Sequence, residues 1–154
     1  MSHEPGCSLC DHVGGTILRE TPEFRIVLVN DAEAKDYPGF CRVIWKSHVK
    51  EMTDLSESQQ IRLFSAVLAV ERLLREVFRP HKINLASLGN MTPHVHWHII
   101  PRYTTDATFP KPIWATPTLQ PISHRQISMS QFDYKEKTRL LQEAVLALHF
   151  DLGA

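Results

Sequence analysis

This sequence lacks any apolar run that approaches the roughly 20 residues needed to cross a bilayer. Its first residues, 1–5, are polar and have none of the hydrophobic character of a secretory signal peptide. Both absences argue against a membrane-embedded or exported protein. We therefore expect a soluble protein of the cytoplasm, with no membrane partner.

An excess of charge of one sign is also absent. Seventeen basic side chains balance seventeen acidic ones, so the formal net charge is zero. Proteins that bind a nucleic acid polymer or an anionic membrane through long-range attraction carry a surplus of positive charge. The balance argues against both partners, and any phosphate group must be recognised by local contacts.

Cysteine is scarce, and its three copies do not pair into a disulfide framework. A chain of 154 residues can bury an ordinary core without covalent staples. Cys7 and Cys10 form a C-x-x-C pair, which in a reducing compartment is typical of metal or redox sites. Cys41 stands alone in an apolar run, which is typical of a small core residue.

No internal repeat, low-complexity tract or second-domain boundary divides the chain, so we expect a single domain over residues 1–154. Alternating and β-branched patterns predict five strands, at residues 16–20, 24–29, 40–45 and 81–88 and from 94 to about 101–103. The first two read as a hairpin and the last two as antiparallel neighbours.

Two helices are predicted around these strands. The first begins after Ser56, which forms a capping-box pattern with Gln59, and ends near Phe78. The second spans about residues 133–149, after a proline-rich, packed loop at 104–127. The fold class is therefore α+β: a five-stranded, mainly antiparallel sheet with one long helix packed on it and a C-terminal helix.

The most informative segment is His94-Val95-His96-Trp97-His98-Ile99-Ile100. In a β-strand its alternate imidazoles lie on one face, and its apolar residues anchor the other face to the core. A lone histidine usually carries no chemistry, but three in register favour a functional site. At a rise of ~3.3 Å per residue the outer Cα atoms lie ~13 Å apart, whereas zinc ligands lie ~2 Å from one ion. We therefore expect the three histidines to have different roles.

Neutral imidazole, with an ordinary pKa of ~6.5, serves as nucleophile, base or acid near physiological pH. Attack of one imidazole on phosphorus gives a phosphoramidate and divides a difficult displacement into two easier steps. A second imidazole can assist the leaving oxygen or stabilise growing negative charge. His96 and His98, ~6.6 Å apart along a strand, could share one phosphate in this way.

Residues 94–100 match the pattern His-φ-His-φ-His-φ-φ, where φ is apolar, and the chain resembles the histidine-triad (HIT) family of nucleotide hydrolases and transferases. Weaker matches are the cysteine pair, the strand end at 28–30 and the segment 38–48, so that the resemblance covers about residues 7–103. It implies a HIT-like fold and a covalent nucleotidyl-histidine intermediate. Phe40 and Trp45 stand where the family often has histidine and proline, which leaves base and leaving-group preference open.

The same resemblance implies roles for individual residues. His96 would be the nucleophile on the α-phosphorus of a bound nucleotide, and His98 would contact the phosphate and assist the leaving group. His94 would orient the centre through hydrogen bonds. The polar side chains that correspond to the family's ribose, phosphate and leaving-group contacts are Asn30, Asn84, Asn90 and Thr92.

In some relatives the cysteine pair binds zinc. The resemblance would then assign a structural zinc to Cys7, Cys10, His48 and His94, a Cys2His2 tetrahedron closed to substrate. Such a site removes His94 from the reaction. The alternative is a pair of solvent-facing thiols, with His48 a hydrogen-bonding residue, and the sequence leaves both open.

The leading hypothesis is a hydrolase or transferase that cleaves the α-phosphate linkage of dinucleoside polyphosphates, nucleoside phosphoramidates or related adenylylated compounds, with no cofactor required for catalysis. One alternative is a nucleotide-binding regulatory module with little turnover, and another is a metal-dependent protein with histidine ligands. The resemblance also implies a homodimer, whose candidate contacts are the loop around Trp114 and the last helix.

Overall fold

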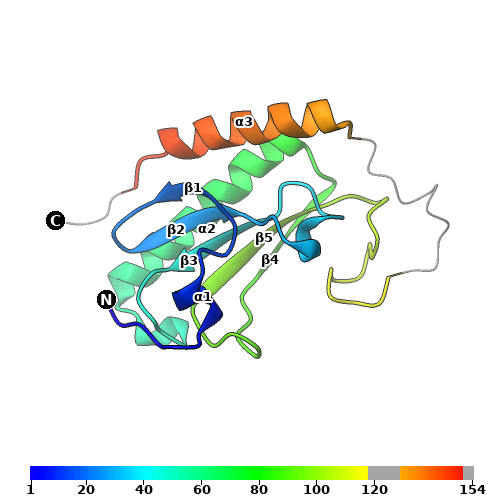
Figure 1. Cartoon of the computed structure of the whole chain (residues 1–154). Coiled ribbons are helices and arrows are strands. Elements are labelled where there is room, and N and C mark those ends of the chain that lie inside the picture. The colour runs from blue at the N-terminus through cyan, green and yellow to red at the C-terminus, as the bar shows by residue number, and fades with distance from the viewer. Residues whose placement is uncertain (118–128, 151–154) are drawn as a thin grey trace.

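The computed structural model describes residues 1–117 and 129–150 and contains a five-stranded sheet with helices packed on it (Figure 1). The strands are β1 (Thr16–Glu20), β2 (Phe24–Leu28), β3 (Cys41–Trp45), β4 (Lys82–Ala86) and β5 (His96–Arg102). The helices are α1 (Ser8–Asp11), α2 (Glu57–Phe78) and α3 (Gln131–Ala147), with short 3-10 helices η1 (Ala32–Ala34) and η2 (Met52–Asp54). The sheet order is β1-β2-β3-β5-β4 and all neighbours are antiparallel. This confirms the predicted α+β fold.

The strand of the histidine segment begins at His96, two residues later than predicted. The amide of His94 donates to the carbonyl of Thr92, and the amide of Val95 donates to the carbonyl of Val49. The two amides just before β5 therefore bond to loop carbonyls, while the carbonyl of Val95 still accepts from the amide of Trp45 at the end of β3. The short elements α1, η1 and η2 were not predicted.

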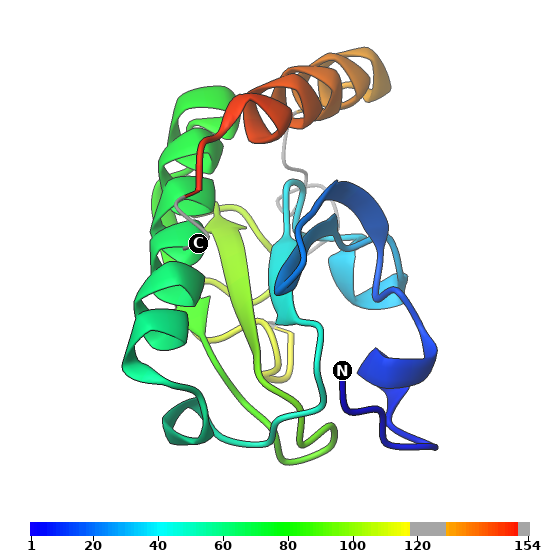
Figure 2. The same cartoon turned by 90° about the vertical axis from the view of Figure 1, so that its left-hand side faces the viewer.

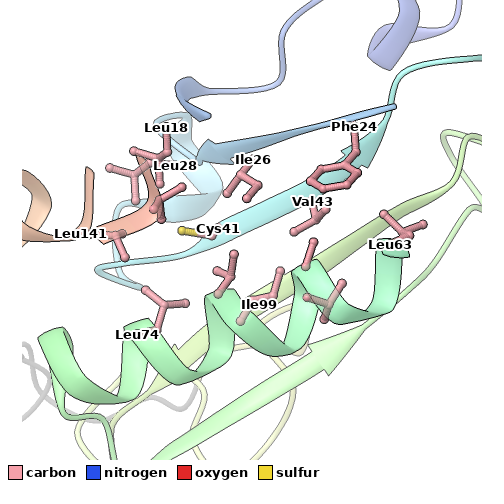
Figure 3. Close-up of a cluster of buried hydrophobic side chains, with 14 of the residues drawn as sticks. Leu18, Phe24, Ile26, Leu28, Cys41, Val43, Leu63, Leu74, Ile99 and Leu141 are labelled. Atoms are coloured by element: carbon pink, nitrogen blue, oxygen red, sulfur yellow. The ribbon is translucent and has the colours of Figure 1, made fainter. Parts of the chain in front are cut away.

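Helix α2 covers one face of the sheet, as Figures 1 and 2 show from two directions. The predicted capping box is present, because the Ser56 hydroxyl accepts from the Gln59 amide and the Gln59 side chain accepts from the Ser56 amide. Alternate strand residues and the inner side of α2 form the main core (Figure 3), which includes Leu18, Phe24, Ile26, Leu28, Cys41, Val43, Leu63, Leu74, Ile99 and Leu141. The predicted core placement of Cys41 is thus confirmed.

Helix α3 packs against α2 and β1. It begins at Gln131, two residues earlier than predicted, because the Ser130 hydroxyl caps it by accepting from the amide of Asp133. At its other end Arg19 of β1 donates to the carbonyls of Val145 and Leu146 in the last turn, and the carbonyl of Val145 also accepts from the amide of Leu148. Within residues 1–117 and 129–150, no helix combines the length and the apolar character that a bilayer span requires.

The face of the sheet away from α2 carries the polar side chains. In the antiparallel register Arg42 of β3 lies opposite His98 of β5, and Ile44 lies opposite His96. Because alternate residues of a strand share a face, these side chains and Asn84 of β4 project to the same side. We call this the open face. Figure 2 shows α1 on this side of the sheet and α2 on the other.

Residues 104–117, the described part of the proline-rich loop predicted at 104–127, are packed around the end of β5, whereas 118–128 lie outside the described residues. Arg102 is 1% exposed, and its guanidinium donates to both carboxylate oxygens of Asp106 at 2.7 and 3.0 Å. It also donates to the carbonyl of Lys111 at 2.8 Å. One buried ion pair therefore anchors the segment that covers this end of the open face.

Removing Asp106 should be costly, because it leaves the charge of Arg102 buried without its counter-charge. Burial alone would raise the pKa of Asp106, but the hydrogen bonds from Arg102 and from the amides of Thr108 and Phe109 hold the pKa below its usual value. The carboxylate is thus charged at neutral pH, and its stabilising effect is lost only as the pH falls through that lowered pKa. We predict that Asp106→Ala lowers the free energy of unfolding by about 3–5 kcal/mol in urea titrations at pH 7.

The control is Glu136→Ala, which removes an exposed ion pair with Arg139 on α3 and should have a far smaller effect. Equal losses of stability in the two variants would contradict the assigned role of the buried pair.

Candidate active site

The three histidines of residues 94–98 lie in two different environments. The ring of His94 contacts the sulfur atoms of Cys7 and Cys10, with Nδ1 at 3.5 Å from each. The rings of His96 and His98 face each other, and their Nε2 atoms are 3.1 Å apart. All three rings are buried. The open face therefore holds an imidazole pair and, at the start of β5, a separate sulfur-and-imidazole cluster.

The hydrogen bonds of His96 fix its tautomer. Its Nδ1 lies 2.6 Å from the carbonyl oxygen of His94, and because a carbonyl oxygen can only accept, Nδ1 carries the hydrogen. Burial lowers the pKa of His96, and the charge of Arg42 lowers it further. At physiological pH the ring is therefore neutral, with its lone pair on the Nε2 that faces His98.

His98 has the complementary arrangement. The Nε of Arg42 lies 3.4 Å from Nδ1 of His98, and because a guanidinium can only donate, that nitrogen accepts and Nε2 carries the hydrogen. Burial, with smaller contributions from His96 and the charge of Arg42, lowers the pKa of His98 to about 3. The pair thus presents a nucleophilic lone pair and an N–H donor side by side.

Three residues around His98 are not among the site residues predicted from the sequence. Arg42 comes from β3 and Glu33 from η1, while the indole ring of Trp114 lies with its centroid 5.1 Å from that of the His98 ring. Arg42 occupies one alternate position in an otherwise apolar strand, which predicts its face but not its partner. Glu33 and Trp114 are 81 residues apart in the chain, and no local pattern joins them.

Asn84, predicted as a phosphate contact, lies on the open face of β4, next to β5. Its side-chain oxygen accepts a hydrogen bond from Arg102 at 2.8 Å. It also lines a cavity of about 600 Å³ together with Trp114, whose ring packs on His98. Asn84 is therefore close to the imidazole pair, with its amide group oriented by Arg102.

Asn30, predicted as a ribose contact, is placed further away. Its side chain donates to the hydroxyl of Thr16 at 3.0 Å, and it lines a larger cavity of about 970 Å³ with η1 and with Tyr134 of α3. His96 and His98 line neither of these two cavities. The structure thus does not bring Asn30 and Asn84 into one pocket.

The last two predicted contacts lie in the turn before β5. Asn90 is exposed there. The hydroxyl of Thr92 is 3.1 Å from that of Ser8 in α1, so Thr92 lies toward the cysteine pair rather than between the rings of His96 and His98.

Cys7, Cys10, His48 and His94 form a group whose ligand atoms all lie within 4.8 Å of one another. The Nε2 of His94 is 2.6 Å from the carbonyl oxygen of Trp45, so this nitrogen carries the hydrogen and the lone pair on Nδ1 points toward the sulfurs. Zinc bonds of ~2.3 Å to sulfur and ~2.0 Å to nitrogen separate neighbouring ligands of a tetrahedron by about 3.5 Å. The observed S···N separations of 3.4–3.5 Å agree, so these four residues fit a metal ion.

The AP-4-A phosphorylase of Mycobacterium tuberculosis is 30% identical over 78 residues, which is 47% of this chain and 40% of that protein. The bis(5'-nucleosyl)-tetraphosphatase (asymmetrical) of Schizosaccharomyces pombe is 35% identical over 74 residues, 45% of this chain and 41% of that protein. The chain thus spans about two fifths of the length of the curated relatives it matches.

Solved structures extend the likeness to nearly the whole fold. A histidine triad protein of Bradyrhizobium japonicum is 26% identical with a TM-score of 0.70, and 94% of this chain and 99% of that chain are covered. One from Marinobacter aquaeolei is 28% identical with a TM-score of 0.67, covering 89% and 93%. A zinc-bound histidine triad family protein of Mycobacterium smegmatis, 19% identical with a TM-score of 0.57 and coverage of 92% and 94%, shares the fold.

The family model described as the HIT domain matches residues 14–105, which is more than half of the chain and includes the whole histidine segment. The matched residues include all five strands of the sheet and both imidazoles of the pair. The chain belongs to the HIT domain family.

Proposed function

We propose that this protein is a nucleotidyl hydrolase or transferase that cleaves the α-phosphate linkage of dinucleoside polyphosphates, nucleoside phosphoramidates or related adenylylated compounds. The observation that carries the proposal is the pair of buried, neutral rings of His96 and His98, whose Nε2 atoms, one with a lone pair and one with an N–H, lie 3.1 Å apart. The names of the two curated relatives, a phosphorylase of AP-4-A and a bis(5'-nucleosyl)-tetraphosphatase, support the substrate class.

In the first step Nε2 of His96 attacks the α-phosphorus and an N–P bond forms. The bond from phosphorus to the leaving group breaks, and its electron pair goes to the leaving oxygen. The N–H of His98 donates a hydrogen bond to that oxygen and stabilises its negative charge. The ring of His96 now carries a positive charge, which the carbonyl of His94 stabilises through Nδ1–H at 2.6 Å.

In the second step an acceptor attacks phosphorus from the vacated side. With water as acceptor, one proton is lost to solvent, the N–P bond breaks with its electron pair returning to Nε2, and a nucleoside monophosphate leaves. Nδ1 keeps its hydrogen throughout, so His96 returns to the same neutral tautomer. The phosphorylase among the relatives favours inorganic phosphate as a second candidate acceptor.

Two features favour this proposal over the other interpretations of the sequence. A metal held by Cys7, Cys10, His48 and His94 would have four protein ligands, which leaves no open position for substrate. His96 and His98 lie outside that group, so they remain available for covalent chemistry. A regulatory module with little turnover would need no nucleophilic lone pair, and the experiment below separates it from an enzyme. The homodimer and the ribose contact by Asn30 stay predictions.

We predict that His96→Ala abolishes both turnover and the covalent intermediate. Rapid acid quenching of the wild type with radiolabelled diadenosine tetraphosphate should trap an acid-labile, protein-bound nucleotide. In His96→Ala the label should be absent, and the rate should fall at least about a thousandfold because the nucleophile is lost.

His149→Ala, an exposed histidine beyond α3, is the matched control and should behave as the wild type. Full turnover by His96→Ala would end the proposal. Micromolar nucleotide binding by the wild type without product would support the regulatory module instead.

We also propose that Cys7, Cys10, His48 and His94 hold one structural zinc ion. The bound ion would tie the N-terminal helix α1 to the start of β5 and to the loop after β3, and so fix the carbonyl of His94 that contacts His96. Its contribution would be to stability, since all four positions are filled by the protein.

Cobalt titration tests this site, because tetrahedral Co²⁺ with thiolate ligands gives intense charge-transfer absorption. We expect one Co²⁺ per chain in the wild type and in Cys41→Ala, a control in the core far from the cluster. Cys10→Ser should lose the charge-transfer bands, and chelation should lower the melting temperature of the wild type but not that of Cys10→Ser. Unchanged cobalt spectra in Cys10→Ser would contradict the ligand assignment.

A further inference from the structure

Four side chains make a closed circuit around the second imidazole of the pair. Arg42 donates from Nε to Nδ1 of His98 at 3.4 Å and from Nη2 to Oε2 of Glu33 at 2.5 Å. The indole N–H of Trp114 donates to Oε1 of the same carboxylate, and the indole ring packs against the ring of His98. The circuit joins β5, β3, η1 and the loop after β5. Nε and Nη2 of Arg42 and the indole N–H of Trp114 each have an acceptor within this set, so the four groups hold one another in place.

The guanidinium of Arg42 is held at both of its outer nitrogens. Nη2 is paired with Glu33, and Nη1 donates to the carbonyl of Gly14 at 3.4 Å. The side chain is only 13% exposed. Because a guanidinium is planar and rigid, fixing these two nitrogens also fixes the direction of the third, Nε, which faces His98. A lysine ammonium in the same place could not make three such contacts in a fixed plane.

A neutral imidazole can carry its hydrogen on either nitrogen, and its ring can also turn over. A fixed donor at Nδ1 of His98 disfavours the tautomer that carries hydrogen there, because two N–H groups would then face each other. It equally disfavours the turned ring, which would present a C–H to the guanidinium. Only the state with hydrogen on Nε2, directed at Nε2 of His96, keeps both contacts.

We propose that Arg42 is a positioning residue for the proposed reaction: held by Glu33, it keeps the hydrogen of His98 on Nε2, from which it can be donated to the leaving group. This inference rests on the proposed function of the imidazole pair. It assigns a role to a residue for which the sequence predicted none. It also makes Trp114, through Glu33, part of the support for the same N–H.

Direct binding of substrate phosphate by Arg42 is the competing role. Two carboxylates already face this guanidinium, Glu33 at 2.5 Å and Asp31 at 3.8 Å. Their negative charges neutralise its attraction for an anion and occupy the outer nitrogens that a phosphate would need. A positioning role uses Nε, the nitrogen that remains, and leaves the ion pair intact.

The first test measures leaving-group dependence with aryl esters of adenosine 5'-monophosphate, from the p-nitrophenyl to the phenyl ester. Arg42→Leu should reduce kcat by about tenfold for the phenyl ester, which needs stabilisation of its leaving oxygen, and little for the p-nitrophenyl ester. KM should stay unchanged for both esters. Arg42→Lys should resemble Arg42→Leu, and Arg72→Leu, on the exposed side of α2, should resemble the wild type.

The second test needs no substrate. In ¹⁵N-histidine-labelled protein, long-range ¹H–¹⁵N spectra should show His98 with hydrogen on Nε2 in the wild type and a mixture of tautomers in Arg42→Leu, with other amide signals retained as evidence of an intact fold. Hydrogen on Nδ1 of His98 in the wild type would overturn the inference. So would equal losses of kcat on both esters, or a raised KM with an unchanged kcat, which would make Arg42 a phosphate ligand.

The two proposals can fail separately. Absence of a trapped nucleotide on His96 would remove the proposed function while leaving the tautomer of His98 as measured. In the opposite case, the nucleotide is trapped on His96, but Arg42→Leu does not change the slope of the rate against the pKa of the leaving group. That result would support the proposed function and contradict the role of Arg42.

Discussion

The proposed chemistry depends on one backbone acceptor, the carbonyl of His94, which lies 2.6 Å from Nδ1 of His96. This oxygen holds the hydrogen on the side of the ring away from His98, so that Nε2 carries the lone pair that would attack phosphorus. It also opposes the positive charge that the ring acquires when it is bonded to phosphorus. A side-chain acceptor could rotate away from this position. The carbonyl of His94 cannot, because it belongs to the backbone that leads directly into β5.

One face of the sheet forms the hydrophobic core, and the other face carries the side chains proposed for the reaction. The face against α2 and α3 is filled with aliphatic and aromatic side chains, so the strands are held in one register. That register places Arg42 opposite His98 and Ile44 opposite His96, and a slip of one residue would bury the imidazoles in the core. At one end of the open face the pair Arg102 and Asp106 anchors the loop, and at the other end the cysteine and histidine cluster lies beside α1. The pair of His96 and His98 lies on the open face between this ion pair and this cluster.

The elements with strong local signals could be predicted from the sequence. The alternation of histidine with apolar residues in 94–100 correctly places His96 and His98 on one face, and the Ser56 capping box marks the start of α2. The prediction that His48 lies beside the cysteine pair came from the resemblance to a known family and not from the spacing of these residues. The start of β5 was predicted two residues early, because periodicity does not register the loop bonds of His94 and Val95. The support of His98 by Arg42, Glu33 and Trp114 could not be predicted, since their contacts join segments between residues 33 and 114 that are distant in the chain and depend on how the loops fold.

The position of the α-phosphorus relative to His96 is the most direct test of this account. It can be measured in a crystal structure of the protein with a methylene-bridged, non-hydrolysable dinucleoside tetraphosphate. We expect the α-phosphorus within about 3–3.5 Å of Nε2 of His96, with the bridging atom toward His98 and Nδ1 of His96 still bonded to the carbonyl of His94. A nucleotide bound with its phosphates in the cavity beside Asn30, and with Nε2 of His96 still in contact only with His98, would contradict it.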